Sequence, residues 1–472
     1  MLDALFSRLA ALFTAPDQPE TALHCLDVAS YADWYSAQPP AIRQQLKAAR
    51  VNGKAGELAL LSTEAANPAK AQRLLLLIDL QQPPLVWLDP LTQLAGLPEI
   101  LRPSEPLPEA ALLGYGLSAY HFSLGRDPKR QAPCLAVPSW PRAALEAQWL
   151  AMELINSPAS ALGPAEFAAI AQNLAQRHGG RVEHITGNEL AKGYPAIHAV
   201  GRGAEAGREP RLLRLSFGES NGEGNGEGKV ETALVGKGVT FDTGGLNLKP
   251  DRAMRYMKKD MGGAAHALAL AHWLATDDPA TRFDVWLPLV ENAIGSAAFR
   301  PGDILNTRAG LRVEVGHTDA EGRLILADAL TRASEEKPEL ILDFATLTGA
   351  ARVALGPYIA PFFSNSDALA TALDAAGRAT HDPLWRLPLV EPYRAWIKPR
   401  VADLTNAPDR PYAGAITAAL FLQAFVPETV AWAHLDIFAW SPERSAARPA
   451  GGAAQALRAV QHMLKERSWT PS

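Results

Sequence analysis

From about residue 160 onward, short apolar runs of strand length alternate with longer segments whose apolar residues recur at helical spacing. Parallel strands need long crossover connections, which are usually helices, so this alternation indicates an α/β domain. We therefore predict an α/β fold in which helices flank a central mixed sheet. The expected strands are 212–217, 232–235, 284–290, 340–344 and 430–437, and the expected helices are 253–274, 320–334 and 453–465.

The first 140 residues are rich in Pro, Ala and Leu and carry no cluster of acids, histidines or cysteines. A chain of 472 residues exceeds one ordinary hydrophobic core, so two domains are expected. The Pro-bounded stretch 132–141 is interpreted as the linker. We predict an N-terminal α/β domain at 1–140 and a C-terminal α/β catalytic domain at 141–472. The further elements expected are strands at 74–80 and 85–88 and helices at 90–97, 112–124 and 143–155.

The composition bears on which partners the protein is expected to bind and on the cellular compartment in which it is expected to lie. A net charge of -5 lacks the basic excess typical of a general nucleic-acid surface, so nucleic acid is not an expected partner. No apolar run approaches the roughly 20 residues of a membrane span, so no membrane partner is expected. The two cysteines, Cys25 and Cys134, cannot form a disulfide framework, which predicts a reducing, cytoplasmic location. Asp3 and Arg8 argue against an N-terminal signal peptide.

Polar residues gather at three points where predicted strands end or a helix begins, and the first is residues 235–250. An apolar strand there runs into a Gly-rich loop that carries Lys237, Asp242 and Lys249. In open α/β sheets, sites form outside the carboxyl ends of strands. The alternative is a turn with solvated lysines, and this segment alone does not decide between the two. The segment lacks the P-loop pattern, so it does not predict phosphate binding.

The second point is residues 257–270, where Asp260 lies in an apolar, small-residue segment that we expect to be helical. An unpaired carboxylate is costly in such surroundings. For this segment alone, the favoured interpretation is that Asp260 is exposed on the polar side, near two neighbouring lysines. His266 and His272 are not spaced as a zinc pair and are interpreted as core or surface histidines.

The third point is residues 316–330, where two acids and an arginine alternate at the start of a predicted helix: Asp319, Glu321 and Arg323. A capping box between Thr318 and Glu321 explains both acids as helix-start residues. Alternate residues of an extended segment face one way, which instead directs all three side chains into one cleft. The helix-start explanation leaves Arg323 without a role.

Taken together, the three segments favour a metal centre. Four carboxylates gathered in one cleft repel one another or take up protons. Two divalent cations supply the missing positive charge. Oxygen ligands without His or Cys suit Mg, Mn or Zn, which leaves the identity of the metal open. The four acids are Asp242, Asp260, Asp319 and Glu321.

At these residues the chain resembles the leucyl aminopeptidase family of dinuclear metallopeptidases. The segments VGKGVTFDTGG, MKKDMGGAA and TDAEGRL match the family signatures in order and spacing, and DFATLTGA and WAHLDI add support. The resemblance covers about residues 150–440. It implies a hydrolase that removes the first residue from short peptides with a free amino end. It also implies a homo-oligomer, because the family forms hexamers.

The resemblance implies a set of metal ligands. Asp242 and Glu321 would bridge two divalent ions, Zn or Mn, with Mg as a further candidate. Asp319 would complete the shell of one ion, and Lys237 with Asp260 that of the other. An amine binds metal only when it is neutral, so the cations must lower the pKa of Lys237.

The resemblance also implies two catalytic residues and a pocket. Lys249 would stabilise the oxyanion of the tetrahedral intermediate. Arg323 stays protonated and would hold a bicarbonate ion that relays the proton. Met257, Thr346 and Gly349 match positions that line the pocket for the first side chain.

Three positions depart from the family pattern. His317 stands where the family usually has Asn, Thr243 replaces the more usual Ser, and the residues at 438–440 are larger than is common after WAHLDI. These changes bear on the hydrogen bonds around the metals and on the shape of the pocket. Two alternative functions are another two-metal hydrolase, such as a phosphoesterase, and a non-catalytic binding protein. The presence of both Lys249 and Arg323 argues against the second alternative.

Overall fold

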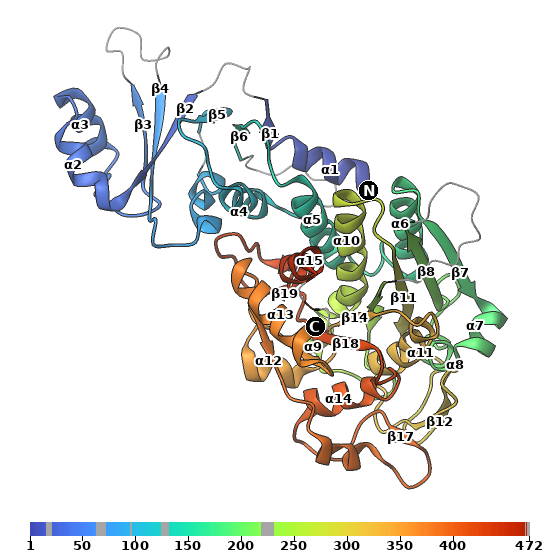
Figure 1. Cartoon of the computed structure of the whole chain (residues 1–472). Helices are drawn as coiled ribbons and strands as arrows, with labels where there is room; N and C mark the ends of the chain where they lie inside the picture. Colours follow the sequence, from blue (N-terminus) through green and yellow to red (C-terminus); the bar gives the residue numbers. More distant parts are fainter. Residues whose placement is uncertain are drawn as a thin grey trace. The chain divides into compact units, whose positions relative to one another are not determined.

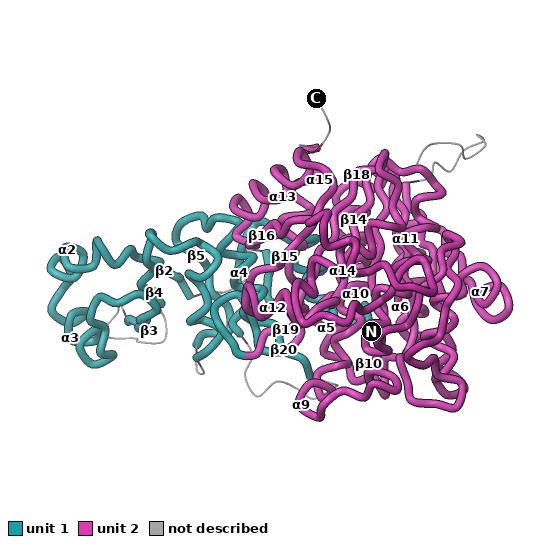
Figure 2. The backbone as a smooth tube through the Cα atoms, turned by 90° about the horizontal axis from the view of Figure 1, so that it is seen from below, with its two compact units in different colours: residues 1–149, 443–450 teal, residues 150–442, 451–472 magenta. Residues whose placement is uncertain are grey.

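The computed structural model describes residues 1–15, 21–62, 72–94, 97–123, 132–218, 231–467 and 469 (Figure 1). The chain forms two compact units, coloured separately in Figure 2. Unit 1 contains residues 1–149 and 443–450, and unit 2 contains residues 150–442 and 451–472. Within the described residues, every helix is too short or too polar to cross a lipid bilayer.

Unit 1 is built on a six-stranded sheet with the strand order β1-β6-β5-β2-β4-β3. All neighbours are parallel except β3 and β4. The most buried strand is β4, in which Leu74 to Leu77 are inaccessible to solvent, and it confirms the strand predicted at 74–80. The strands are β1 (Phe13–Thr14), β2 (Thr21–Asp27), β3 (Leu58–Ser62), β4 (Gln72–Ile78), β5 (Ile100–Pro103) and β6 (Cys134–Ala136).

The helices of unit 1 agree only in part with the sequence predictions. The strand predicted at 85–88 is wrong, because prolines at 83 and 84 begin a short 3-10 helix, η2 (Pro84–Val86). The linker predicted at 132–141 is also wrong, because its centre forms β6 between β1 and β5. The helix predicted at 112–124 is confirmed as α4 but ends at Ala119, and the described part of the one predicted at 90–97 forms only the 3-10 helix η3; residues 95, 96 and 124 lie outside the described residues. The helices are α1 (Leu2–Ala10), η1 (Val28–Ser30), α2 (Tyr31–Ser36), α3 (Pro40–Ala48), η2, η3 (Asp89–Thr92) and α4 (Glu109–Ala119).

Unit 2 is built on a nine-stranded mixed sheet, as predicted. Its strand order is β16-β15-β18-β14-β9-β11-β8-β7, and β10 pairs with β11. The centre from β18 to β11 is parallel, whereas β8 pairs antiparallel with β11 and β15 with β18. The five predicted strands are confirmed as β8, β9, β11, β14 and β18. The strands are β7 (Arg181–Thr186), β8 (Arg211–Phe217), β9 (Thr232–Gly236), β10 (Gly238–Asp242), β11 (Phe283–Asn292), β14 (Leu340–Ala345), β15 (Ala360–Ser364), β16 (Leu384–Arg386) and β18 (Ala431–Asp436).

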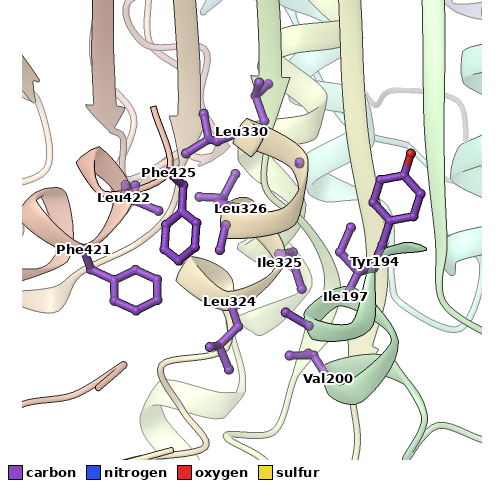
Figure 3. Close-up of a cluster of buried hydrophobic side chains, with 14 of the residues drawn as sticks. Tyr194, Ile197, Val200, Leu324, Ile325, Leu326, Leu330, Phe421, Leu422 and Phe425 are labelled. Atoms are coloured by element: carbon purple, nitrogen blue, oxygen red, sulfur yellow. The ribbon is translucent and has the colours of Figure 1, made fainter. Parts of the chain in front are cut away.

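Helices cover both faces of this sheet. Alternate residues of a strand face opposite sides, and in β9 Ala233 and Val235 belong to the hydrophobic core under α11, whereas Gly236 abuts Ala264 of α10. The core under α11 also contains side chains of α8 and α14 (Figure 3). Burial of each Leu, Ile or Phe there contributes about 1.5–3 kcal/mol.

The remaining elements of unit 2 connect these strands; they are given together with α5, whose residues 142–149 belong to unit 1. The helices predicted at 320–334 and 453–465 are confirmed as α11 and α15, and α5 confirms the helix at 143–155. The helices are α5 (Arg142–Asn156), α6 (Pro164–Arg177), α7 (Gly187–Gly193), α8 (Pro195–Gly201), α9 (Asp251–Met254), η4 (Met257–Met261), α10 (Gly262–Asp277), α11 (Gly322–Glu335), α12 (Gly349–Leu355), α13 (Asp367–Ala379), η5 (Glu391–Ile397), α14 (Gly414–Gln423) and α15 (Leu457–Glu466). The short strands are β12 (Ile304–Asn306), β13 (Arg312–Glu314), β17 (Leu404–Thr405), β19 (Trp440–Ser441) and β20 (Gly451–Gly452).

The single helix predicted at 253–274 is wrong in its first half. The chain forms α9 and η4 there, and α10 begins only at Gly262. The start of α10 packs so close to the end of β14 that a Cβ atom on Gly263 would lie 2.0 Å from the carbonyl oxygen of Phe344. This approach is possible only for glycine, and it brings Asp260, three residues earlier in the chain, to the end of the sheet.

Candidate functional site

The candidate site lies where three strands of the unit 2 sheet end. Gly236 of β9 is paired with Phe344 of β14, and the backbone N–H of Lys237 donates to the Phe344 carbonyl oxygen at 2.9 Å. The strand β10 follows Lys237 and ends at Asp242. The carboxyl ends of adjacent parallel strands share one edge of a sheet, so the loops after β9, β10 and β14 meet there.

Lys237 joins two of the predicted acids. Its Nζ atom lies 2.9 Å from Asp260 Oδ2 and 2.9 Å from Glu321 Oε1, and it donates a hydrogen bond to the Thr346 carbonyl oxygen at 3.1 Å. Burial lowers the pKa of Lys237, but the carboxylates of Asp260 and Glu321 outweigh it and raise the pKa above its usual value. A Cβ atom on Gly322 would lie 2.5 Å from Lys237 Cε, so α11 must begin with glycine to leave room for this amine.

Lys249 joins the other two acids. Its Nζ atom lies 2.7 Å from Asp242 Oδ2 and also contacts Asp319 Oδ1. The second oxygen of Asp242 accepts hydrogen bonds from the Gly244 N–H and from Asn292 Nδ2, both at 2.8 Å. Burial, together with the charge of Asp260, raises the pKa of Asp242 to about 6.

The four acids together carry more negative charge than the two lysines balance. Carboxylate oxygens of Asp242, Asp319 and Glu321 lie within 4.8 Å of one another, and Asp260 is connected to them through Lys237. Glu321 Oε2 is buried without a hydrogen-bond partner. Burial and the charge of Asp242 raise the pKa of Glu321 to about 8. We call these four acids with Lys237 and Lys249 the carboxylate cluster; its donor set and its unpaired oxygen fit divalent cations.

Arg323 lies beside this cluster on α11 and is 8% exposed. Its Nη1 atom donates to the carbonyl oxygen of Asn406, whereas its Nε atom is buried without a hydrogen-bond partner. Burial lowers the pKa of Arg323 to about 10, so the guanidinium is charged at neutral pH. A charged guanidinium with an unused donor fits a small oxyanion such as bicarbonate.

Of the predicted pocket residues, Thr346 contacts Asp260 directly. Met257 is buried one turn before Asp260 on η4, and the hydroxyl of Thr346 donates to Asp260 Oδ1 at 2.7 Å. Gly349 is the first residue of α12, directly after the loop that contains Thr346. The structure therefore brings Thr346 to the four acids and two lysines, with Arg323 beside them, whereas Met257 and Gly349 lie on the adjoining segments η4 and α12.

Asp436 at the end of β18 fixes the loop before α12. Its Oδ1 accepts from the backbone N–H groups of Leu347 at 2.9 Å and Thr348 at 3.1 Å, and its Oδ2 accepts from the Thr348 hydroxyl at 2.6 Å. Sequence reasoning missed Asp436, although its place at the end of an apolar strand was a usable signal. The same reasoning missed Asn292, which holds Asp242 from the end of β11.

Two interpretations weighed from the sequence are wrong. Asp260 is 3% exposed, so it does not lie on a solvated helix face. The capping box between Thr318 and Glu321 does not form, because α11 begins at Gly322 and no side chain caps it. The Thr318 hydroxyl donates instead to the Gly244 carbonyl oxygen at 2.6 Å and so ties the helix start to the Gly-rich loop.

The residues that depart from the family pattern take part in hydrogen bonds around the cluster. The Nδ1 atom of His317 accepts from the Asp319 N–H at 3.2 Å, and the Thr243 hydroxyl donates to the Asn292 carbonyl oxygen at 2.8 Å. His266 and His272 are both buried, which agrees with core histidines.

The family model and the curated relatives that match this chain carry the same family name. Residues 149–461 match the model of the "Cytosol aminopeptidase family, catalytic domain". A curated "Probable cytosol aminopeptidase" from Rhizobium meliloti (strain 1021) is 45% identical over 294 residues, which are 62% of this chain and 57% of that protein. The chain spans less than two thirds of the length of the curated relatives that it matches.

Two solved structures resemble nearly the whole chain. The cytosol aminopeptidase from Coxiella burnetii is 40% identical with a TM-score of 0.88, over 97% of this chain and 99% of that one. The bottromycin maturation enzyme BotP in complex with Mn is 31% identical with a TM-score of 0.82, over 96% of this chain and 100% of that one.

Proposed function

Because the chain belongs to the cytosol aminopeptidase family, we propose that it is a metal-dependent aminopeptidase. The reaction is hydrolysis of the first peptide bond of short peptides that have a free amino end. The observation that carries this proposal is the convergence of Asp242, Asp319 and Glu321, whose carboxylate oxygens lie within 4.8 Å of one another. Like charges held this close, with Asp242 and Glu321 buried, favour the binding of cations.

We propose that the carboxylate cluster holds two divalent ions, Zn or Mn, with Mg as a further candidate. Asp242, Asp260, Asp319 and Glu321, together with Lys237, would hold these ions. When bound, such an ion pair polarises the scissile carbonyl group and lowers the pKa of a water molecule. Lys237 must lose its proton to become a ligand, which frees Asp260 and Glu321 from their ion pairs with it. Support for manganese comes from the related BotP structure in complex with Mn.

Lys249 and Arg323 act on the substrate in this proposal. The Lys249 side chain is 13% exposed, so its ammonium group can donate to the oxyanion that forms at the carbonyl group. Arg323 would hold a bicarbonate ion through its unused Nε donor, and the bicarbonate would supply the proton-accepting group that Arg323 itself cannot provide. Met257, Thr346 and Gly349 line the pocket for the first side chain.

The organisation of the protein follows from the same assignment. We propose that residues 141–472 form the catalytic domain and residues 1–140 an N-terminal α/β domain. We further propose a cytoplasmic, hexameric enzyme with peptides as its only partners besides other copies of the chain. Gel filtration with light scattering tests the hexamer.

Metal analysis combined with activity measurements tests the central proposal. The protein is depleted with a chelator, reloaded with Zn, Mn or Mg, and assayed with leucine p-nitroanilide, a phosphodiester and duplex DNA. We expect about two ions per chain and anilide hydrolysis only in the reloaded protein. Hydrolysis of the phosphodiester alone would assign another two-metal reaction, and DNA binding without any hydrolysis would assign a binding protein.

A further inference from the structure

Two cations flank one aromatic ring near the carboxylate cluster. The Nζ atom of Lys259 lies 5.3 Å from the centre of the Phe438 ring, and the guanidinium carbon of Arg352 lies 4.6 Å from the same centre. Lys259 is 2% exposed, whereas Arg352 and Phe438 are half-buried. We call these three residues the cation cluster.

The cation cluster has no anion of its own. Among the described residues, neither Lys259 nor Arg352 forms an ion pair or a side-chain hydrogen bond, whereas most buried cations of unit 2 do. The nearest acid in sequence, Asp260, is already engaged by Lys237 and by the Thr346 hydroxyl. Asp260 therefore offsets only part of the charge of Lys259, and Arg352 has no ion-pair partner among the described residues.

Such an arrangement is costly unless a ligand completes it. A buried charge without a partner loses several kcal/mol of solvation, and a cation over an aromatic ring recovers only about 0.5–2 kcal/mol. Arg352 stays protonated at any physiological pH, so its charge cannot be lost by titration. An anionic group seated near both cations would supply the missing partner.

The position of the cation cluster specifies which group of a substrate can reach it. Lys259 lies on η4 between Met257 and Asp260, and a terminal nitrogen of Arg352 lies 3.4 Å from where a Cβ atom on Gly349 would stand. Phe438 lies two residues beyond Asp436. These are the segments to which we assigned the pocket for the first side chain, so the anion that meets the cations is on that side chain.

We propose that Arg352, Lys259 and Phe438 form a subsite for a carboxylate group, and that the enzyme prefers peptides whose first residue is acidic. This inference rests on the proposed function. Arg352 supplies the permanent charge and a planar set of donors that matches a carboxylate group. Phe438 supports the methylene groups of the side chain and keeps both cations in place.

A comparison of isosteric substrates tests the subsite. The p-nitroanilides of Glu and Gln differ in charge and hardly in size, so the ratio of their kcat/KM values measures recognition of the carboxylate group. In the metal-loaded enzyme we expect a Glu-to-Gln ratio of about 10 or more, because an ion pair that leaves water is worth at least that factor. Arg352→Gln should lower the ratio about 10-fold through KM, and Lys259→Met should lower it less.

The matched control is Arg378→Gln, which removes an exposed arginine of α13 that is paired with Asp374. Its Glu-to-Gln ratio should equal that of the wild type. A wild-type ratio near or below one, with leucine p-nitroanilide hydrolysed normally, would overturn the subsite and leave the proposed function intact. A high ratio that Arg352→Gln and Lys259→Met do not change would overturn the assignment to these residues. Failure to hydrolyse any anilide in the metal-loaded protein would overturn the proposed function itself.

Discussion

The carboxylate cluster and the buried histidine of α10 differ in how their polar atoms are satisfied. His266 is fully buried, its Nδ1 atom lies 2.6 Å from the Gly262 carbonyl oxygen, and its Nε2 atom accepts from the Gln455 N–H at 2.9 Å. Both ring nitrogens are used and the ring is neutral. In the carboxylate cluster, by contrast, Glu321 Oε2 is buried with no partner.

Burial alone therefore does not mark the functional site. A buried polar group whose hydrogen bonds are complete stabilises the fold, whereas a buried cluster with excess charge is stable only with a ligand. The cation cluster has an excess of positive charge instead, and its Lys259 is next to Asp260 in the sequence. We therefore expect substitutions in the carboxylate and cation clusters to change ligand binding. Substitution of His266, whose hydrogen bonds are complete, should change stability instead.

The largest expected effect is that of Glu321→Gln. The neutral side chain removes one of the four charges that require cations, so we expect loss of one or both metal ions and turnover at the background level. The metal-free variant should melt at about the same temperature as the metal-free wild type, because the pKa of Glu321, raised to about 8, already leaves this carboxyl group largely protonated at neutral pH. Metal content and calorimetry check both outcomes.

The control for this variant is Glu335→Gln at the other end of α11, where the side chain pairs with Arg308 at the surface. It should keep both metal ions and full turnover. Two bound ions and normal turnover in Glu321→Gln would show that this carboxylate is not a ligand.

Lys249→Met separates catalysis from metal binding. The substitution removes the proposed oxyanion donor, whose loss costs about 100- to 1000-fold in kcat. Metal content should not fall, because the Asp242 and Asp319 carboxylates are released from their ion pairs with this lysine. Lys398→Met, at an exposed position, is the matched control. Retention of full kcat in Lys249→Met would exclude the assigned role.

The sequence predicted the strands of unit 2 well because their signal is local. Strands such as β11 and β14 are buried on both faces, so they appear as continuous apolar runs. The strand β6 was missed because its three residues are flanked by prolines, and only pairing with the distant β1 and β5 makes it a strand. The break between η4 and α10 was missed for a similar reason, since it depends on contact between Gly263 and Phe344.

The candidate site was predictable only from its segments in combination. Asp260 alone was expected on a solvated face, and the acid at 321 alone was explained by a helix cap. The excess charge became visible when the four acids were considered as one set. Asp436 had a usable signal in its place at the end of an apolar strand, but its role and that of Asn292 depend on hydrogen bonds across neighbouring strand ends that only the fold brings together.

The pH dependence of the melting temperature tests the role of His266, the buried side chain whose hydrogen bonds are complete. Burial lowers its pKa from 6.5 to about 4. A histidine whose pKa is depressed in the folded state stabilises the fold above pH 6.5, and this contribution is lost as the pH falls from 6.5 to 4. The full loss is about 3 kcal/mol. The melting temperature of the metal-free wild type should therefore fall more steeply over this range than that of His266→Gln, and parallel curves would contradict the assignment.

The smallest expected effect is that of Asp436→Ala, which acts on the pocket from outside the carboxylate cluster. The substitution leaves the N–H groups of Leu347 and Thr348 without their acceptor, at a cost of about 1–3 kcal/mol. Because this loop carries Thr346 to Asp260, we expect KM to rise about 10-fold, equivalent to 1.4 kcal/mol, with metal content unchanged. Asp436→Asn keeps an acceptor oxygen for both N–H groups and should restore most of the wild-type KM. A KM that is normal in the alanine variant, or equally raised in both variants, would show that these hydrogen bonds do not position the loop for substrate.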